Sequence, residues 1–243
     1  MSPRLLLPHA GEATGPVLVQ GDAFHHLRVL RLGPGDPLEV FDGKGRAWEA
    51  EVLEVSRDSA TVRLGPLRKA STGRHVSLLQ ALPKADKLEL VLQKGTELGA
   101  HAFFPVLSER SVVRLSGAAL ETRRVRWQRI AEEAARQCGR ADVPSVHAVQ
   151  GLFAAVRALP PTTRVLLLDE EERTLGLSEA ASVDARAPLA LVVGPEGGLE
   201  RTEVEALREL GATSVSLGPL VLRTETAALA ALAVLRHREG LLG

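Results

Sequence analysis

The chain has 243 residues, of which 45% are hydrophobic, so it can bury one large core or two of ordinary size. No stretch approaches the roughly 20 consecutive apolar residues that a membrane-spanning helix needs, and residues 1–8 are too short and too early broken to form a signal peptide. The single cysteine, Cys138, excludes an internal disulfide and a cysteine-rich zinc site, and the seven histidines show no metal-binding spacing. We therefore expect a metal-free protein of the reducing cytoplasm, with Cys138 as a small buried residue.

The formal net charge is zero, but charge is distributed unevenly along the chain. Residues 71–140 carry twelve basic and seven acidic side chains, whereas residues 141–243 carry nine and fourteen. This asymmetry fits one basic face for a polyanion, and it fits ordinary solvated helix faces equally well. Charge alone therefore does not decide whether the chain binds nucleic acid.

The first seventy residues read as β structure. Alternating apolar and polar residues between glycine turns are typical of hairpin-linked strands in a small barrel, here expected at 38–41, 47–55 and 61–64. One helix is expected over residues 21–31. The stretch 65–73, which contains glycine, proline, serine and threonine, is the expected linker.

From residue 74 onward strands alternate with helices, which is the pattern of a parallel α/β sheet. The expected strands are 76–82, 102–105, 165–168 and 189–193. The last two are continuous apolar runs, as buried parallel strands require. Asp86 is expected to cap the first helix and Gly99 to close it. The expected helices are 86–98, 121–137, 200–210 and 225–237. The pattern predicts two domains, residues 1–70 and residues 74–243.

A glycine-rich turn, residues 194–198, directly follows the second of these apolar runs. Glycines let a ligand approach the backbone closely, and the bare amides of such a turn can hold polar groups. The spacing matches neither the dinucleotide fingerprint nor a phosphate-binding loop. Taken alone, five residues fit a plain strand-to-helix turn better than a ligand site.

A second candidate segment is the apolar loop 217–222, which ends in polar residues at the start of an alanine-rich helix. Thr224 is expected to cap this helix, and Glu225 suits the positive end of the helix dipole. The cation of Arg223 gains nothing from that dipole. It therefore either faces solvent or is held there for a purpose.

Taken together, these segments resemble one family, the bacterial 16S ribosomal RNA uridine N3-methyltransferases of the knotted SPOUT superfamily. The resemblance covers nearly the whole chain. It rests on the order and spacing of HHLRVLR at 25–31, FDG at 41–43 with Gly45, QKGTELG at 93–99, SERSVV at 108–113, RWQRI at 126–130, EAARQCGR at 133–140, GPEGG at 194–198 and LRTETA at 222–227.

The resemblance implies a PUA-like RNA-binding barrel at 1–70 and an α/β SPOUT methyltransferase domain with a deep trefoil knot at 74–243. It implies S-adenosylmethionine as the methyl donor and, as the target, a decoding-region uridine of 16S rRNA (position 1498 in standard numbering) in the small ribosomal subunit. Carried over to this chain, the loops of the knot would bind the donor through Leu168, Val193, Gly194, Pro195, Glu196, Gly197, Gly198, Leu217, Gly218, Leu220, Leu222, Thr224 and Thr226.

For catalysis, we expect Arg223 to face the uracil and stabilise charge on its carbonyl oxygens, with Glu196 or Glu225 accepting the N3 proton. SPOUT enzymes generally pair through the C-terminal region, and residues 227–234 are apolar nearly all round, so we expect a homodimer. The expected RNA contacts are Arg28, Arg31, Lys94, Arg110, Arg114, Arg136 and Arg140.

Two positions depart from the family pattern. Glu200 stands where the family usually has serine, and Thr202 with Glu205 offers a substitute capping box. Leu220 stands where the family typically has another arginine. Two other functions stay open, a ribose 2′-O-methyltransferase on the same fold and a non-catalytic RNA-binding assembly factor.

Overall fold

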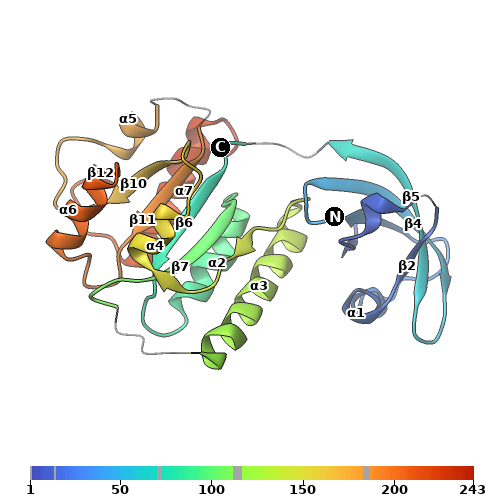
Figure 1. The fold of residues 1–243 in the computed structure, drawn as a ribbon. Coiled ribbons are helices and arrows are strands. Elements are labelled where there is room, and N and C mark those ends of the chain that lie inside the picture. The colour runs from blue at the N-terminus through green and yellow to red at the C-terminus, as the bar shows by residue number, and fades with distance from the viewer. Residues whose placement is uncertain (1, 14, 70–72, 112–116, 183–186) are drawn as a thin grey trace. The chain divides into compact units, whose positions relative to one another are not determined.

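The structure is a computed structural model that describes residues 2–13, 15–69, 73–111, 117–182 and 187–243. The chain divides into two compact units (Figure 1). The first comprises the residues up to Thr72 together with Ala135–Val143, and the second comprises Gly73–Ala134 and Pro144–Gly243. The segment Ala135–Val143 thus belongs with the N-terminal unit, because Ala141 packs on Phe41 and Ala47 there.

The first unit is a five-stranded sheet of strand order β1-β3-β4-β5-β2. Strands β1 and β3 are parallel, and the other pairs are antiparallel. Helix α1 contributes Phe24 and Leu27 to the core of this unit. The elements are β1 (Arg4–Leu6), the short 3₁₀ helix η1 (Ala10–Glu12), β2 (Val17–Val19), α1 (Gly21–Val29), β3 (Pro37–Phe41), β4 (Arg46–Val55) and β5 (Ala60–Lys69).

Three expectations for this unit need correction. The expected linker is wrong over residues 65–69, because β5 continues there and Leu67 pairs with Trp48 of β4. Strands β1 and β2 were not expected at all, since each has only three residues. Helix α1 ends at Val29, and Arg31 beyond it has a left-handed φ of 56°.

The second unit is a parallel sheet of order β12-β10-β11-β6-β7-β8, with β9 also paired to β7, as the strand-helix alternation predicts. None of the described helices is long and apolar enough to cross a membrane. The elements are β6 (Val76–Ala81), α2 (Lys87–Glu97), β7 (Ala102–Leu107), α3 (Ala118–Cys138), β8 (Ser145–Val146), β9 (Gln150–Gly151), α4 (Leu152–Arg157), β10 (Arg164–Leu168), α5 (Leu177–Ser182), β11 (Leu189–Val193), α6 (Arg201–Glu209), β12 (Thr213–Val215) and α7 (Thr224–Arg238).

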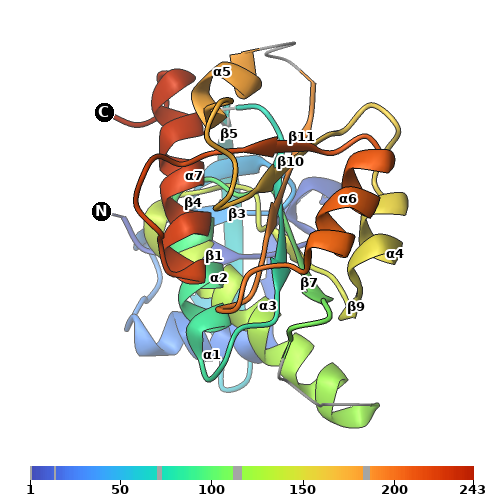
Figure 2. The same ribbon diagram turned by 90° about the vertical axis from the view of Figure 1, so that its left-hand side faces the viewer.

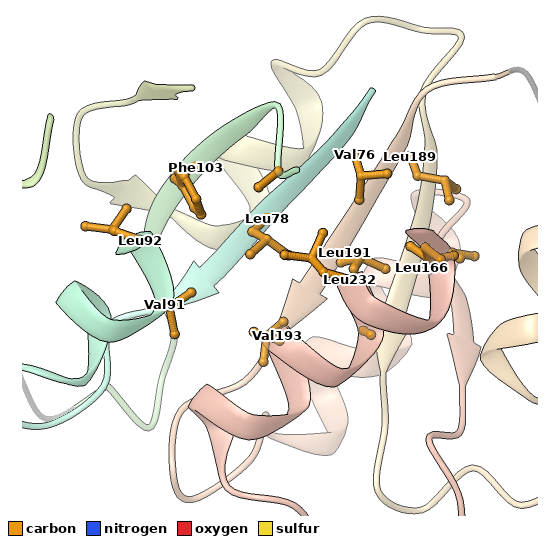
Figure 3. Close-up of a cluster of buried hydrophobic side chains, with 14 of the residues drawn as sticks. Val76, Leu78, Val91, Leu92, Phe103, Leu166, Leu189, Leu191, Val193 and Leu232 are labelled. Carbon is orange, nitrogen blue, oxygen red and sulfur yellow. The ribbon is translucent and has the colours of Figure 1, made fainter. Parts of the chain in front are cut away.

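Helices cover both faces of this sheet, which explains the continuous apolar runs. In β11, Leu189, Leu191 and Val193 pack with α2, α3, α5 and α7, whereas Ala190 and Val192 pack with α4 and α6. Figure 2 shows α7 and α2 on one side of the sheet and α4 and α6 on the other. Figure 3 shows the first of these two cores, in which Leu232 of α7 meets Leu191.

Two local expectations for helices α2 and α3 are wrong. Asp86 precedes α2, but its side chain makes no capping hydrogen bond. Cys138, expected to be buried, is half-exposed at the end of α3, with its Sγ 3.7 Å from the Ala135 carbonyl oxygen. Gly99 closes α2 as expected, with a φ of 86° that favours glycine.

Candidate active site

A cavity of about 270 Å³ lies at the carboxyl ends of β10, β11 and β12, and the loops that follow these strands form its walls. Ligands of open α/β sheets bind at this edge, because the loops and exposed backbone groups gather there. Two of the three loops, 194–198 and 217–222, are the segments singled out from the sequence. All the expected donor-binding residues line the cavity except Gly197 and Thr226.

The glycine turn is built for close backbone packing. A Cβ on Gly194 would lie 3.1 Å from the carbonyl carbon of Gly198, so no side chain fits there without moving the backbone. Gly198 has a φ of 70°, which L side chains rarely adopt. The turn therefore presents backbone rather than side chains to the cavity at these two positions.

Thr224 ties the turn to the neighbouring segments. Its hydroxyl donates to the Gly194 carbonyl oxygen at 2.5 Å and accepts from Nε2 of Gln80 at 2.8 Å. Thr224 and Gln80 are both buried, at 5% and 1% exposure. The expectation that Thr224 caps α7 is wrong, because Arg223 occupies the N-cap position. The hydroxyl instead bonds to Gly194, which follows β11, and to Gln80 of β6.

An ion-pair cluster lies at the rim of the cavity. The Lys87 ammonium is 2.8 Å from Oε1 of Glu196 and 3.6 Å from Oε2 of Glu225, and the backbone N–H of Lys84 also donates to Glu196 at 3.1 Å. Burial alone would raise the pKa of Glu196, but these hydrogen bonds outweigh burial and hold the pKa below its ordinary value. Both carboxylates face Lys87, but only Glu196 of the two lines the cavity. Sequence reasoning missed Lys87, whose only signal is its place in the first turn of a helix.

The loop after β10 begins with a buried carboxylate that sequence reasoning also missed. Asp169 accepts from Nη1 of Arg201 at 3.1 Å and from the backbone N–H of Glu171 at 3.0 Å. Further along, hydrogen bonds from the hydroxyl and backbone N–H of Thr174 lower the pKa of Glu172 to about 2. The available signal was the acidic run 169–172 at the end of a buried strand.

The start of α6 corrects the capping expectation. The helix begins at Arg201, and Glu203 accepts from the backbone N–H of Glu200 at 3.0 Å, so the proposed pair of Thr202 and Glu205 does not cap it. The side chain of Glu200 binds the Arg110 guanidinium through both oxygens, at 2.7 and 2.9 Å. Arg110 also donates to the Gly197 carbonyl oxygen at 2.5 Å, which anchors the glycine turn from outside.

Arg223 is exposed and lines the cavity. Within the described part of the chain its guanidinium has neither a hydrogen bond nor an ion pair, because Glu225, two residues away, faces Lys87. Leu220 and Val221 beside it are 76% and 81% exposed. The rim of the cavity thus combines an unpaired cation with two exposed apolar side chains.

The residues expected to contact RNA differ in exposure and in whether they already have ion-pair partners. Arg28 and Arg31 are exposed in the first unit. Four others already have partners or are half-buried in the fold, and Arg114 lies outside the described residues. The pairs are Lys94 with Glu97 at 2.8 Å, Arg110 with Glu200 at 2.7 Å and Arg140 with Asp142 at 2.5 Å, and the half-buried residue is Arg136.

Two arginines of α3 that sequence reasoning did not single out are better placed for RNA. Arg123 and Arg129 are exposed, and neither has an ion-pair partner among the residues that the structure describes. Their neighbour Arg124 is paired with Glu121 at 2.6 Å. The exposed face of α3 therefore carries unpaired positive charge.

Comparison with known proteins identifies relatives of both units. Residues 70–236 match the family model of the RNA methyltransferase domain, and residues 19–65 match that of the RNA methyltransferase PUA domain. The chain is 36% identical to ribosomal RNA small subunit methyltransferase E of Bacillus subtilis, over 92% of this chain and 91% of that protein. It is 39% identical to the protein of that name from Mycobacterium bovis, over 90% and 86% of the two chains.

A solved structure of a relative matches nearly the whole chain. Ribosomal RNA small subunit methyltransferase E from Neisseria gonorrhoeae, bound to S-adenosyl methionine, is similar to this chain with a TM-score of 0.88. The two are 31% identical, and the match covers 98% of each chain. The likeness therefore extends over both units and all the loops of the cavity.

Proposed function

Because the chain belongs to the ribosomal RNA small subunit methyltransferase E family, we propose that it methylates N3 of a uridine in 16S rRNA, with S-adenosylmethionine as methyl donor. The observation that carries this proposal is the cavity at the ends of β10, β11 and β12, in a chain whose solved relative was determined with this donor. The PUA-like unit and the small ribosomal subunit as partner follow from the same family.

The cavity fits such a donor. Leu168, Val193 and Leu217 give it apolar walls, and the lack of side chains at Gly194 and Gly198 lets a nucleoside approach the backbone of the glycine turn closely. Its carboxylates, Asp169 and Glu196 among them, suit hydroxyl groups and a cationic ligand. When bound, the donor supplies a sulfonium-activated methyl group, and the electron pair of the broken C–S bond leaves on sulfur.

The residues of the chain must then manage one proton. The N3 proton of uracil has to leave as the methyl group arrives, and Glu196 is our proposed acceptor because it is ionised at the cavity wall. Glu225 is the weaker candidate, since it does not line the cavity. The negative charge that spreads over the uracil carbonyl oxygens would be stabilised by Arg223, which has no competing partner in the described chain. The products are the N3-methylated uridine, the demethylated donor and a proton that Glu196 returns to solvent.

The test is methyl transfer to unmodified small ribosomal subunits and, separately, to free 16S rRNA, with a donor labelled in its methyl group. Digestion to nucleosides should yield labelled N3-methyluridine. A labelled ribose-methylated nucleoside would instead favour the 2′-O-methyltransferase alternative. Donor binding without transfer to either RNA would favour the assembly-factor alternative.

We further propose a homodimer that pairs through α7. In the single chain, Leu229, Ala233 and Val234 of this helix stay half-exposed, and the last two line an apolar groove together with Leu242. A twofold mate would cover this face. Light scattering at micromolar concentration should give twice the chain mass, and a monomer would contradict the proposal. The deep trefoil knot and a cytoplasmic location beside the ribosomal subunits also remain predictions.

A further inference from the structure

Lys87 is a charged residue beside the cavity, and it has no role in the methyl transfer proposed above. It is the first residue of α2, where the helix dipole disfavours a cation. Its ammonium is nevertheless held between the carboxylates of Glu196 and Glu225, at 2.8 and 3.6 Å. The side chains of the three residues are only 30%, 26% and 12% exposed. These partners, rather than the helix, account for a lysine at this position.

The cluster joins three separate segments. Glu196 comes from the glycine turn after β11, Glu225 comes from the first turn of α7, and Lys87 comes from α2. Oε2 of Glu225 is buried with no hydrogen-bond partner in the described residues, so the nearby ammonium compensates its charge. Without Lys87, two partly buried carboxylates would face each other, and one of them would have to take a proton or move.

We propose that Lys87 is a positioning residue for methyl transfer, which holds the Glu196 carboxylate, in its ionised form, at the cavity wall where the N3 proton must leave. This role rests on the proposed function, in which Glu196 is the proton acceptor. Lys87 does not line the cavity and acts through Glu196. Its ammonium also ties the glycine turn to the helix that Arg223 precedes.

The charged groups around Glu196 set the direction of the pH effect. The Lys87 ammonium faces it from α2, and the Lys84 backbone N–H faces it from the segment between β6 and α2. Glu225 of α7 shares that ammonium, and Arg223 lies at the same cavity. Removing Lys87 takes away the main cation and leaves the carboxylate of Glu225. The pKa of Glu196 then rises, so Glu196 is protonated over a wider range of acidic pH and cannot accept the N3 proton there.

The experiment measures single-turnover methyl transfer to small subunits from about pH 5.5 to 9 for the unmodified chain, Lys87→Met and Lys87→Arg. The rate of each variant is divided by that of the unmodified chain at the same pH, which cancels the ionisation of uracil itself. For Lys87→Met we expect this ratio to fall towards the acidic end, because a raised pKa lowers the ionised fraction of Glu196 there. A shift of one pKa unit would reach its full tenfold loss only below both pKa values. Lys87→Arg keeps the cation and should preserve the shape of the profile. Arg124→Met, which breaks the Arg124–Glu121 pair far from the cavity, is the control.

A double-mutant cycle with Glu196→Gln tests whether Lys87 acts through Glu196. If it does, Lys87→Met should cost little further activity once Glu196 is neutral. Donor affinity, measured by equilibrium binding, should stay within about threefold in Lys87→Met, which shows that the variant is folded. A pH-independent ratio, additive losses in the cycle, or loss of donor binding would each overturn the role of Lys87. Absence of transfer by the unmodified chain would instead overturn the proposed function and this role with it.

Discussion

Replacement of Arg223 by alanine separates catalysis from folding and donor binding. The side chain is exposed and has no partner in the described chain, so its removal leaves no buried group unsatisfied. The free energy of unfolding should therefore change by less than about 0.5 kcal/mol. Donor affinity should stay within a few-fold, because the backbone of the glycine turn and the Thr224 contacts are untouched.

The rate should fall much more. At about 4 Å a charge pair is worth roughly 1 kcal/mol in bulk water and roughly 4 kcal/mol at the effective dielectric near a protein surface. A docked base excludes water from this cavity, so the upper part of that range applies. Loss of one charge-stabilising donor at about 2.7 kcal/mol or more corresponds to roughly a hundredfold slower methyl transfer.

The assay combines single-turnover transfer, equilibrium donor binding and thermal unfolding on the same variant. Arg223→Lys keeps the charge but not the planar guanidinium. Its rate of methyl transfer should lie between those of the unmodified chain and the alanine variant. Arg157→Ala removes an exposed arginine of α4, on the opposite face of the sheet, and should leave all three measurements unchanged. Near-normal transfer by Arg223→Ala, or its failure to bind the donor, would show that Arg223 has a structural role.

Thr224→Val should cost about 1–3 kcal/mol of unfolding free energy, since buried Gln80 and half-buried Gly194 each lose a hydrogen bond, and it should also weaken donor binding. An unchanged melting temperature would contradict this. The double variant Arg123→Gln/Arg129→Gln should flatten the salt dependence of RNA binding by about one and a half to two units of slope, whereas Arg124→Gln should not; equal slopes would place the RNA elsewhere. Glu172 has a folded pKa of about 2, below its ordinary value, so its stabilising contribution is present above pH ~4.5 and is lost as pH falls towards 2. Glu172→Gln should therefore be less stable at neutral pH and lose less stability on acidification, as thermal unfolding at a series of pH values would show.

Much of the fold and part of the site follow from local sequence patterns. The continuous apolar run 189–193 predicts a strand buried on both faces, and β11 is such a strand. The glycine turn and the apolar loop after it have compositions that suit ligand-binding loops, and both line the cavity. The unfavourable place of Arg223 at a helix start likewise pointed to a special role, and the structure leaves this cation unpaired at the cavity.

The rest of the fold and of the site depends on contacts between residues far apart in the chain, which local sequence patterns do not reveal. Strand β5 continues through Gly65 and Pro66, two residues that favour turns, because β4 pairs with it on either side of them, at Leu64 and at Leu67. Threonine is a common helix-capping residue, yet the hydroxyl of Thr224 bonds to Gly194, thirty residues away.

The sequence by itself determined the α/β class, the β-rich first unit, the family and the loops that form the cavity, because each depends on periodicity or on the order of short motifs. Only the tertiary structure decided which charges are free and which are paired. Arg110 looked available for RNA but binds Glu200, ninety residues away, and Lys87 looked like an ordinary helix residue but joins Glu196 to Glu225. Hydrogen bonds and ion pairs act over a few ångströms in space, so partners of this kind become neighbours only when the sheet is assembled.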